Sequence, residues 1–317
     1  GVFNMNNLKK IGLTALGTAM ISTGAHAASM SVSGATSIFF NGEDNSDMGN
    51  GWAMTDSITF SASGEMDNGW SVSTSIEMDN HTASASSRSI AIDTGNGKLT
   101  FSGEGGSGPI GAWDDVTPTA NEEAHGVATA GTATGATSDA EDANFFIFDY
   151  TAMDGVALKA SYNPSNAATR VESSTELGVL YTGIDGLSVY YAMGENNDDP
   201  YTAGRKELTN AAIKYAAGSF TIGYQVNEVD SDVADKDQDF SAIGLSYAVS
   251  DDVSVSVNSS TVEYEQSTLD DQEATGVSAS YTSGGMTVSA SLSNIDNVAG
   301  TSTADNSGYE VNFAFAF

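Results

Sequence analysis

Alternation of apolar and small polar residues runs through almost the whole chain. Val253, Val255 and Val257 alternate with two serines and an asparagine, and the segments 69–78 and 286–293 repeat this pattern. Successive side chains of a strand point to opposite faces, so a period of two predicts strands between an apolar and a polar environment. After residue 27, no segment has the roughly 20 consecutive apolar residues of a transmembrane helix. The sequence therefore predicts an all-β fold.

Sixteen such segments can be counted, and their connections alternate strictly between short and long. The expected strands are 30–40, 56–64, 69–78, 88–94, 97–103, 144–151, 156–163, 174–182, 186–194, 205–215, 219–226, 239–248, 253–264, 274–282, 286–293 and 307–317. The short connections contain Gly, Asp or Asn, as hairpin turns do, and all four prolines fall in the long ones. Short periplasmic turns and long external loops are typical of an outer-membrane barrel.

Five tyrosines each precede a short turn, at spacings of 31, 34, 32 and 34 residues: Tyr150, Tyr181, Tyr215, Tyr247 and Tyr281. They are expected to form an aromatic girdle at the inner membrane–water interface. A soluble β-sandwich also has alternating strands, but it requires neither the regular connections nor a tyrosine at a repeated level. We therefore expect a sixteen-stranded antiparallel transmembrane β-barrel of the outer-membrane type.

The first 27 residues read as a processing signal. Lys9 and Lys10 precede an apolar run, 11–21, and a small-residue exit that ends at Ala27. This order matches a secretory signal cleaved after Ala27, and the apolar run is too short to span a bilayer. Residues 28–317 are then expected to form a single barrel domain.

Charge and composition exclude several functions. The net charge of −32 repels nucleic acid, and the lack of cysteine removes thiolate chemistry and cysteine metal sites. Asp235, Asp237 and Asp239 imitate the start of a calcium loop, but Phe240 stands where that loop needs glycine. No cofactor is expected, and weak calcium binding by external carboxylates would have no assignable ligands.

Catalysis by a histidine base would have to use one of two residues. His81 and His125 are the only histidines after residue 27, and both fall in expected loops. A hydrolase with a histidine base would depend on one of them. Solvated loop side chains are the simpler interpretation, and no enzyme is expected.

Four segments, in their order along the chain, resemble the Gram-negative general porins of the alphaproteobacterial type. They are 33–42, the hairpin 60–64 with 68–72, 97–103, and the ending that carries Tyr309, Val311, Phe313, Phe315 and Phe317. The resemblance implies a barrel that commonly forms trimers and passes ions and small hydrophilic solutes by diffusion. It also implies that the insertion machinery of the outer membrane reads the terminal aromatic strand as an assembly signal, through Tyr309, Phe313, Phe315 and Phe317.

The third long connection, 104–143, is far longer than the others. A structureless stretch of this length is uncommon unless it is functional or disordered. The resemblance implies that it folds into the barrel and narrows it, although its Ala/Thr/Gly-rich half could also be a mobile external loop. Parity places Phe145 and Ile147 on the lumen face, where apolar side chains would form a docking wall for an inserted loop.

The loop carries acids and no lysine or arginine. By the resemblance, the constriction is assigned to Glu104, Asp114, Asp115, Glu122 and Glu123, whereas Asp139, Glu141 and Asp142 read as solvated charges. Parity places Lys98, Lys159 and Lys214 on the lumen face, and small residues dominate that face. General porins set a richer basic cluster against their loop acids, which this chain lacks.

These features predict a wide, wet, weakly to moderately cation-preferring diffusion channel. Two alternatives remain at this point. One is an outer-membrane barrel with a solute-specific or hydrolase role, and the other is a secreted acidic β-rich surface protein.

Overall fold

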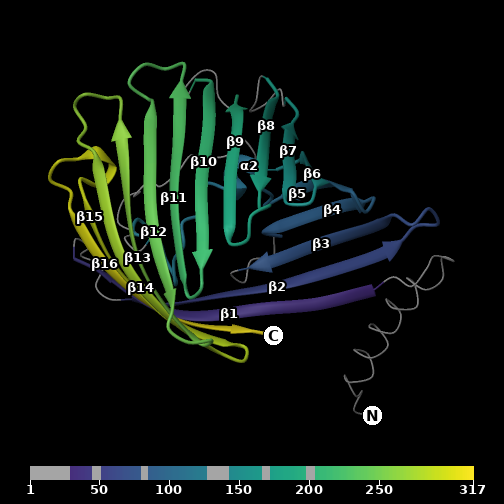
Figure 1. The fold of residues 1–317 in the computed structure, drawn as a ribbon, viewed down its shortest axis with the longest axis horizontal. Helices are drawn as coiled ribbons and strands as arrows, with labels where there is room; N and C mark the ends of the chain where they lie inside the picture. The colour runs from purple at the N-terminus through teal and green to yellow at the C-terminus, as the bar shows by residue number, and fades with distance from the viewer. Residues whose placement is uncertain (1–28, 45–50, 80–84, 127–142, 166–171, 198–203) are drawn as a thin grey trace, which may run out of the picture.

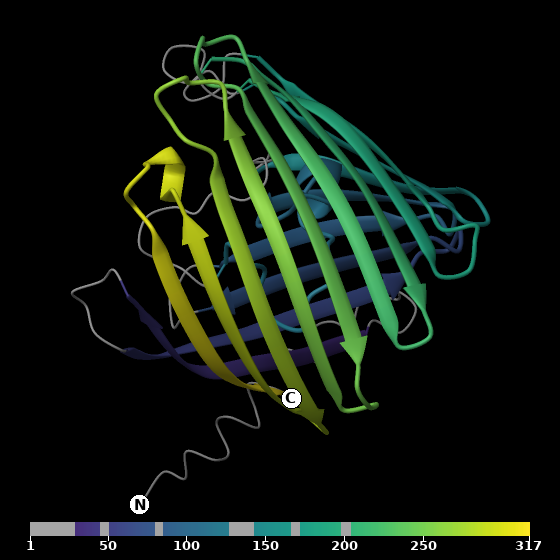
Figure 2. The same cartoon turned by 60° about the vertical axis from the view of Figure 1, so that its left-hand side comes forward.

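The computed structural model describes residues 29–44, 51–79, 85–126, 143–165, 172–197 and 204–317. In these residues, sixteen antiparallel strands close into one barrel, in which sequence neighbours pair and β1 pairs with β16 (Figures 1 and 2). The predicted fold class is confirmed. The expected signal 1–27, His81 and the acids Asp139, Glu141 and Asp142 lie outside the described residues.

The described elements have the following bounds: β1 Ser29–Glu43, β2 Gly51–Glu65, β3 Ser71–Asp79, β4 Ser87–Asp93, β5 Gly97–Glu104, α2 Pro109–Ala112, β6 Phe145–Met153, β7 Val156–Asn163, β8 Ser174–Tyr181, β9 Leu187–Asn196, β10 Lys206–Ala217, β11 Phe220–Ser231, β12 Gln238–Ala248, β13 Val253–Tyr264, β14 Gln272–Ser283, β15 Met286–Asp296, η1 Val298–Gly300 and β16 Asn306–Ala316. None of the helices in the described residues is long and apolar enough to cross a bilayer.

Each strand separates two environments, as strand β6 shows. Phe146 and Phe148 are 40% and 45% exposed on the outer face, whereas Phe145 is fully buried on the inner face. Aromatic side chains that stay exposed on a closed barrel require a lipid environment, because in water they would form a large apolar patch. The barrel wall is therefore apolar outside and mixed inside.

The first two strands are longer than the sequence predicts. The expected loop 41–55 shrinks to the residues between Glu43 and Gly51, because Asn41 pairs with Gly51 and extends the ladder. The rings of Phe40 and Trp52 pack at 4.9 Å between centroids and hold the strands together at this level. Asn, Gly and Glu read as loop residues, so the expected boundaries were wrong here.

The seven short connections all lie at one end of the barrel, called here the short-turn end. Gly95 and Gly155 have φ values of 91° and 74°, a region that residues with a side chain rarely enter. Tyr150, Tyr181 and Tyr215 lie at this end, with their side chains exposed on the outer face. Each of the three lies on the outer face close to a point where the chain reverses.

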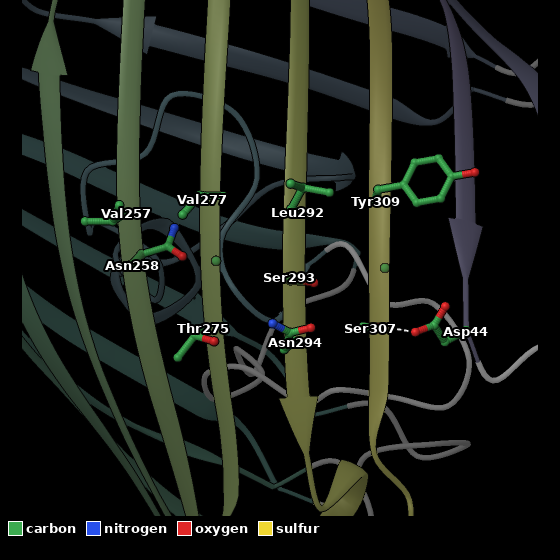
Figure 3. A pocket seen from close by; sticks show the side chains of 12 residues that line it. Asp44, Val257, Asn258, Thr275, Val277, Leu292, Ser293, Asn294, Ser307 and Tyr309 are labelled. Carbon is green, nitrogen blue, oxygen red and sulfur yellow. Dashed lines mark hydrogen bonds between the residues drawn. The ribbon is translucent and has the colours of Figure 1, made fainter.

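The opposite, long-loop end shows where the apolar outer band stops (Figure 3). A shallow cavity of about 570 Å³ on β13–β16 has apolar residues along one side and polar residues along the other. Its apolar lining includes Val257, Val277, Leu292 and Tyr309, and its polar lining includes Thr275, Asn294, Ser307 and Asp44. The Ser307 hydroxyl donates to the Asp44 carboxylate at the polar side.

The last residue extends the pairing of β1 with β16. The Phe317 N–H donates to the Gly34 carbonyl at 3.0 Å, and the Gly34 N–H donates to the Phe317 carbonyl at 2.8 Å. A methyl group at Gly34 would lie 2.8 Å from the Phe317 ring and 2.9 Å from the Ser57 carbonyl oxygen, so a larger residue would displace the ring or the strand. The ends of the paired strands β1 and β16 thus meet through the terminal residue.

Candidate functional site

After β5 the chain turns into the barrel instead of away from it. The segment 105–126 crosses the inside of the barrel, and the single-turn helix α2 contacts β7, β8, β9 and β10 (Figure 2). Pro109 occupies the first turn of α2, where its missing N–H and fixed φ favour a helix start. The inward-folded third loop of the predicted fold is therefore confirmed for these residues.

The loop begins with an anchor at Ile110. Its N–H donates to Oε2 of the buried Glu176 at 3.1 Å, and its carbonyl accepts from Nδ2 of Asn210 at 2.8 Å. The Ile110 side chain packs in a buried cluster with Ala192 and Leu208. Both backbone groups of this residue are therefore satisfied by wall side chains.

Trp113 forms the next contact with the wall. Its ring lies against the backbone of Gly178, where a methyl group would come within 2.2 Å of the indole. It also meets Tyr190 edge-on, with the ring centroids 5.9 Å apart. Further along, Oε1 of Gln225 accepts from the Val116 N–H at 2.8 Å. Trp113 and Gln225 together fix the position of the loop where its acidic residues begin.

Wall serines hold the second half of the loop. The N–H groups of Ala120 and Asn121 donate to Oγ of Ser256 and of Ser278, at 2.8 and 3.1 Å. The Asn121 side chain adds a bond to Oγ of Ser291 at 2.8 Å. All three serines are buried. The sequence predicts that the polar face of β13–β15 lines water. In the structure, this face binds the loop instead.

The two apolar lumen residues of β6 are both buried. Phe145 is fully buried, and its ring lies 3.1 Å from where a methyl group on Gly106 would be. Ile147 is 7% exposed. The loop backbone at Gly106 therefore lies over Phe145, as a docking wall requires.

Four of the five assigned acids stand on one stretch of the loop. Asp115 and Glu123 form a side-chain hydrogen bond. Asp114 and Glu122 lie close enough for their charges to affect the ionisation of Asp115. Glu122 is also close enough to Glu310 on β16 to interact with its charge. Glu104 stands apart from these four at the end of β5, opposite Arg88 in the ladder.

Confinement changes how these acids titrate. Asp115 touches lumen water, but the surrounding wall and loop displace much of its solvent and raise its pKa, and the charges of Asp114 and Glu122 add to this. Burial, followed by the charge of Asp115, raises the pKa of Glu123 to about 7. Burial also raises the pKa of Glu122. Asp115 and Glu123 therefore form a hydrogen-bonded carboxyl pair in which the pKa of each group is raised.

The three assigned lysines are not equivalent. Nζ of Lys159 lies 3.2 Å from Oδ1 of Asp149, and Nζ of Lys98 lies 3.6 Å from Oδ2 of the same carboxylate. Lys98 also faces Asp93 in the ladder, so a row of alternating charges crosses β4–β7. Lys214 lies instead over the ring of Tyr190, with Nζ 5.8 Å from its centroid.

The open side of the lumen lies opposite the loop. Inward-facing Ser33, Thr55 and Ser73 on β1–β3 are exposed, in contrast to the loop-bound serines of β13–β15. Among the described residues, the inner faces of β16, β1, β2 and β3 carry no lysine or arginine. Glu310 and Glu77 lie on these inner faces instead. The water path therefore runs between loop acids and a wall without basic residues.

Sequence reasoning missed the residues that hold the loop. Glu176, Gln225 and Asn210 are buried polar side chains whose inward parity was readable, but their partners depend on the path of the loop. Asp149 was missed for the same reason, because only the strand register shows that it lies between Lys98 and Lys159. In the part of the chain that the structure describes, no group of three or more carboxylates or histidines could hold a metal ion.

The barrel is similar to several solved structures. The loop L8 deletion mutant of OmpT, an outer membrane protein of Vibrio cholerae, has a TM-score of 0.71 at 17% identity, with 92% of this chain and 100% of that chain covered. The in-vitro folded trimer form of OmpT has 0.67 at 14%, with 92% and 100% covered. An anion-selective porin from Comamonas acidovorans has 0.69 at 11%, with 92% and 100% covered. At these identities the likeness shows the shared fold alone.

Sequence comparison identifies the family. No curated protein matches the sequence. The family model described as Gram-negative porin matches residues 12–270, which is well over half of the chain. The closed sixteen-stranded barrel and the loop inside it agree with that match. The chain belongs to the Gram-negative porin family.

Proposed function

We propose that this outer-membrane porin passes ions and small hydrophilic solutes by passive diffusion, with a preference for cations. The observation that carries the proposal is the pairing of an acidic loop with an open wall that has no basic residue among the described positions. Carboxylates along a narrow path raise the local concentration of cations, and low-dielectric walls focus their field. Because the anion-selective porin has the same fold, the fold by itself does not determine whether cations or anions are preferred.

The lysines do not offset this field. Lys98 and Lys159 share the carboxylate of Asp149, and Lys98 also faces Asp93, so this row of two lysines and two aspartates carries no net charge. Lys214 stands on the loop side of the lumen and lines a cavity of about 760 Å³ together with Asp115. Of the three assigned lysines, Lys214 is therefore the one that shares a cavity with a loop carboxylate.

Neutralising the loop acids tests the sign of selectivity. In a planar bilayer with a salt gradient, the wild-type reversal potential is expected to have the sign of a cation-preferring channel. The quadruple variant Asp114→Asn, Asp115→Asn, Glu122→Gln, Glu123→Gln is expected to shift it most of the way to zero, because the four loop carboxylates along the path are neutralised. The effect should weaken as salt rises, since screening acts over about 10 Å at 0.1 M.

A matched control removes the same charge elsewhere. Asp67, Asp154, Asp251 and Asp252 are exposed residues of the short turns. Their joint replacement by asparagine should leave the reversal potential near the wild-type value. An anion-selective wild type, or equal shifts in both quadruple variants, would contradict the proposed role of the loop acids.

The Asp115–Glu123 pair predicts a pH dependence. Because the pKa of Glu123 is raised to about 7, this carboxyl is protonated below that pH and charged above it. Cation preference should therefore increase as pH rises from 6 to 8, and Glu123→Gln should flatten this step. Reversal potentials measured across that range check the prediction, and a wild-type profile without a step would contradict it.

We also propose that the barrel has no catalytic role. Burial lowers the pKa of His125, its Nδ1 has no hydrogen-bond partner, and its ring meets Phe240 edge-on at 5.6 Å. This environment resembles a packing position more than a proton-transfer site, although His81 lies outside the described residues. Solute flux through reconstituted liposomes without chemical turnover of the solute is the expected result.

We further propose that the porin assembles as a homotrimer. Thr36 and Asp56 pair on the outer face of β1 and β2, between Ile38 and Met54 on one side and Ile58 on the other. A carboxylate within the apolar outer band is costly against lipid, and a protein neighbour reduces that cost. The trimer form of OmpT has the same fold. Light scattering of the detergent-solubilised protein gives the oligomer number.

A further inference from the structure

A row of small residues crosses the inner wall where the loop lies. Gly223 on β11 pairs directly with Gly244 on β12, Gly244 pairs with Asn258 on β13, and Asn258 pairs with Gly276 on β14. None of these glycines has a positive φ, so the backbone conformation itself does not require glycine. The requirement comes from the space above them.

Loop residues fill that space. A methyl group at Gly223 would place its carbon 2.6 Å from Cδ of Pro118, and one at Gly244 would lie 2.8 Å from the Pro118 carbonyl oxygen. At Gly276 the methyl carbon would lie 2.9 Å from Cα of Ala124. All three distances are shorter than real carbon contacts, so the loop backbone is seated directly on the strands. We call Gly223, Gly244 and Gly276 the glycine groove.

Hydrogen bonds fix the loop along the groove. Between Pro118 and Ala124, the N–H groups of residues 120 and 121 donate to wall serines, as described above. The Asn258 amide adds a long contact of 3.5 Å to the Glu122 carbonyl. The glycines therefore set how closely the loop approaches the wall. The serines and Asn258 set where along the wall it binds.

We infer that the glycine groove sets the aperture of the pore. The acids Asp115, Glu122 and Glu123 lie within or beside the stretch that Pro118 and Ala124 seat. A side chain in the groove must lift this stretch away from β11–β14, further into the lumen. The inference rests on the proposed diffusion function but not on its cation preference.

Single-channel conductance tests the inference. Gly223→Ala, Gly244→Ala and Gly276→Ala should each lower the conductance, and Gly244→Val should lower it further because its side chain is larger. Gly64→Ala on the outer face of β2 is the control for the substitution itself, since nothing lies within 4 Å of a methyl group there, and it should conduct like wild type. Heat-modifiable gel mobility confirms that each variant is folded before it is measured.

A second comparison separates the groove from a direct effect on the lumen. In a barrel whose residues 109–124 are replaced by a short linker, the same alanine substitutions should leave the conductance unchanged, because no loop is present to be lifted. Folded groove variants that conduct as well as or better than Gly64→Ala would overturn the inference. Reversal potential is recorded in parallel, so an anion-selective wild type with groove-sensitive conductance would refute the cation preference alone.

Discussion

Deletion of Phe317 is expected to prevent most of the chain from reaching the outer membrane as a folded barrel. Phe317 exchanges two backbone hydrogen bonds with Gly34, and its ring stays 75% exposed while it covers that glycine. Losing two hydrogen bonds costs about 1–3 kcal/mol, which is small for a barrel of sixteen paired strands. A large loss of assembly in cells would therefore reflect recognition of the terminal strand by the insertion machinery.

Two measurements distinguish recognition from structural closure. In cells, the truncated chain should accumulate in the periplasm and yield little heat-modifiable barrel, whereas purified truncated chain should still refold in detergent. Phe220→Ala, which removes another exposed aromatic ring beside a short turn, should assemble normally. Normal membrane yield of the truncated chain would refute the assembly signal, and failure to refold in detergent would assign the defect to barrel closure.

Replacement of residues 109–124 by a short Gly/Ser linker is expected to raise the single-channel conductance severalfold. The barrel should remain inserted, because every strand pairs with two neighbours and the wall does not depend on the loop for its backbone hydrogen bonds. Removal of the loop also uncovers the buried serines of β13–β15, which then line water. The change should therefore widen the path over much of the inner wall.

The control for this deletion shortens a different long connection. Removing two residues from the connection 232–237, between β11 and β12, should leave the conductance close to wild type. If the linker variant conducts like wild type, the segment inside the barrel does not limit flow. If the linker variant fails to insert, the loop is part of the folded wall.

Strand positions could be predicted because each strand separates lipid from polar surroundings. Valines that alternate with serines at 253–258 carry this information locally, so no partner strand is needed to read it. Strand ends are less readable, as Asn41 and Gly51 show, because a pair of turn-forming residues can extend a ladder when aromatic neighbours hold it.

The role of each inward residue could not be predicted, because it depends on contacts between distant segments. Ser73 and Ser278 are both inward-facing serines in alternating strands, but one is exposed and the other accepts a hydrogen bond from Asn121, 157 residues away. Likewise, parity places Lys98 on the lumen face, but only the register with Asp149 and Asp93 reveals that its charge is compensated. The acids were recognisable because their stretch of loop contains no basic residue.

The division of the inner wall has a consequence for how such a channel can diversify. A change at Ser278 leaves a buried loop N–H without its acceptor, at a cost of about 1–3 kcal/mol, so this side of the barrel tolerates few replacements. Ser33, Thr55 and Ser73 are exposed across the lumen from the loop and are free to vary in size and charge. New solute preferences can therefore arise by substitution on β1–β3, while the half of the wall that carries the loop stays constant.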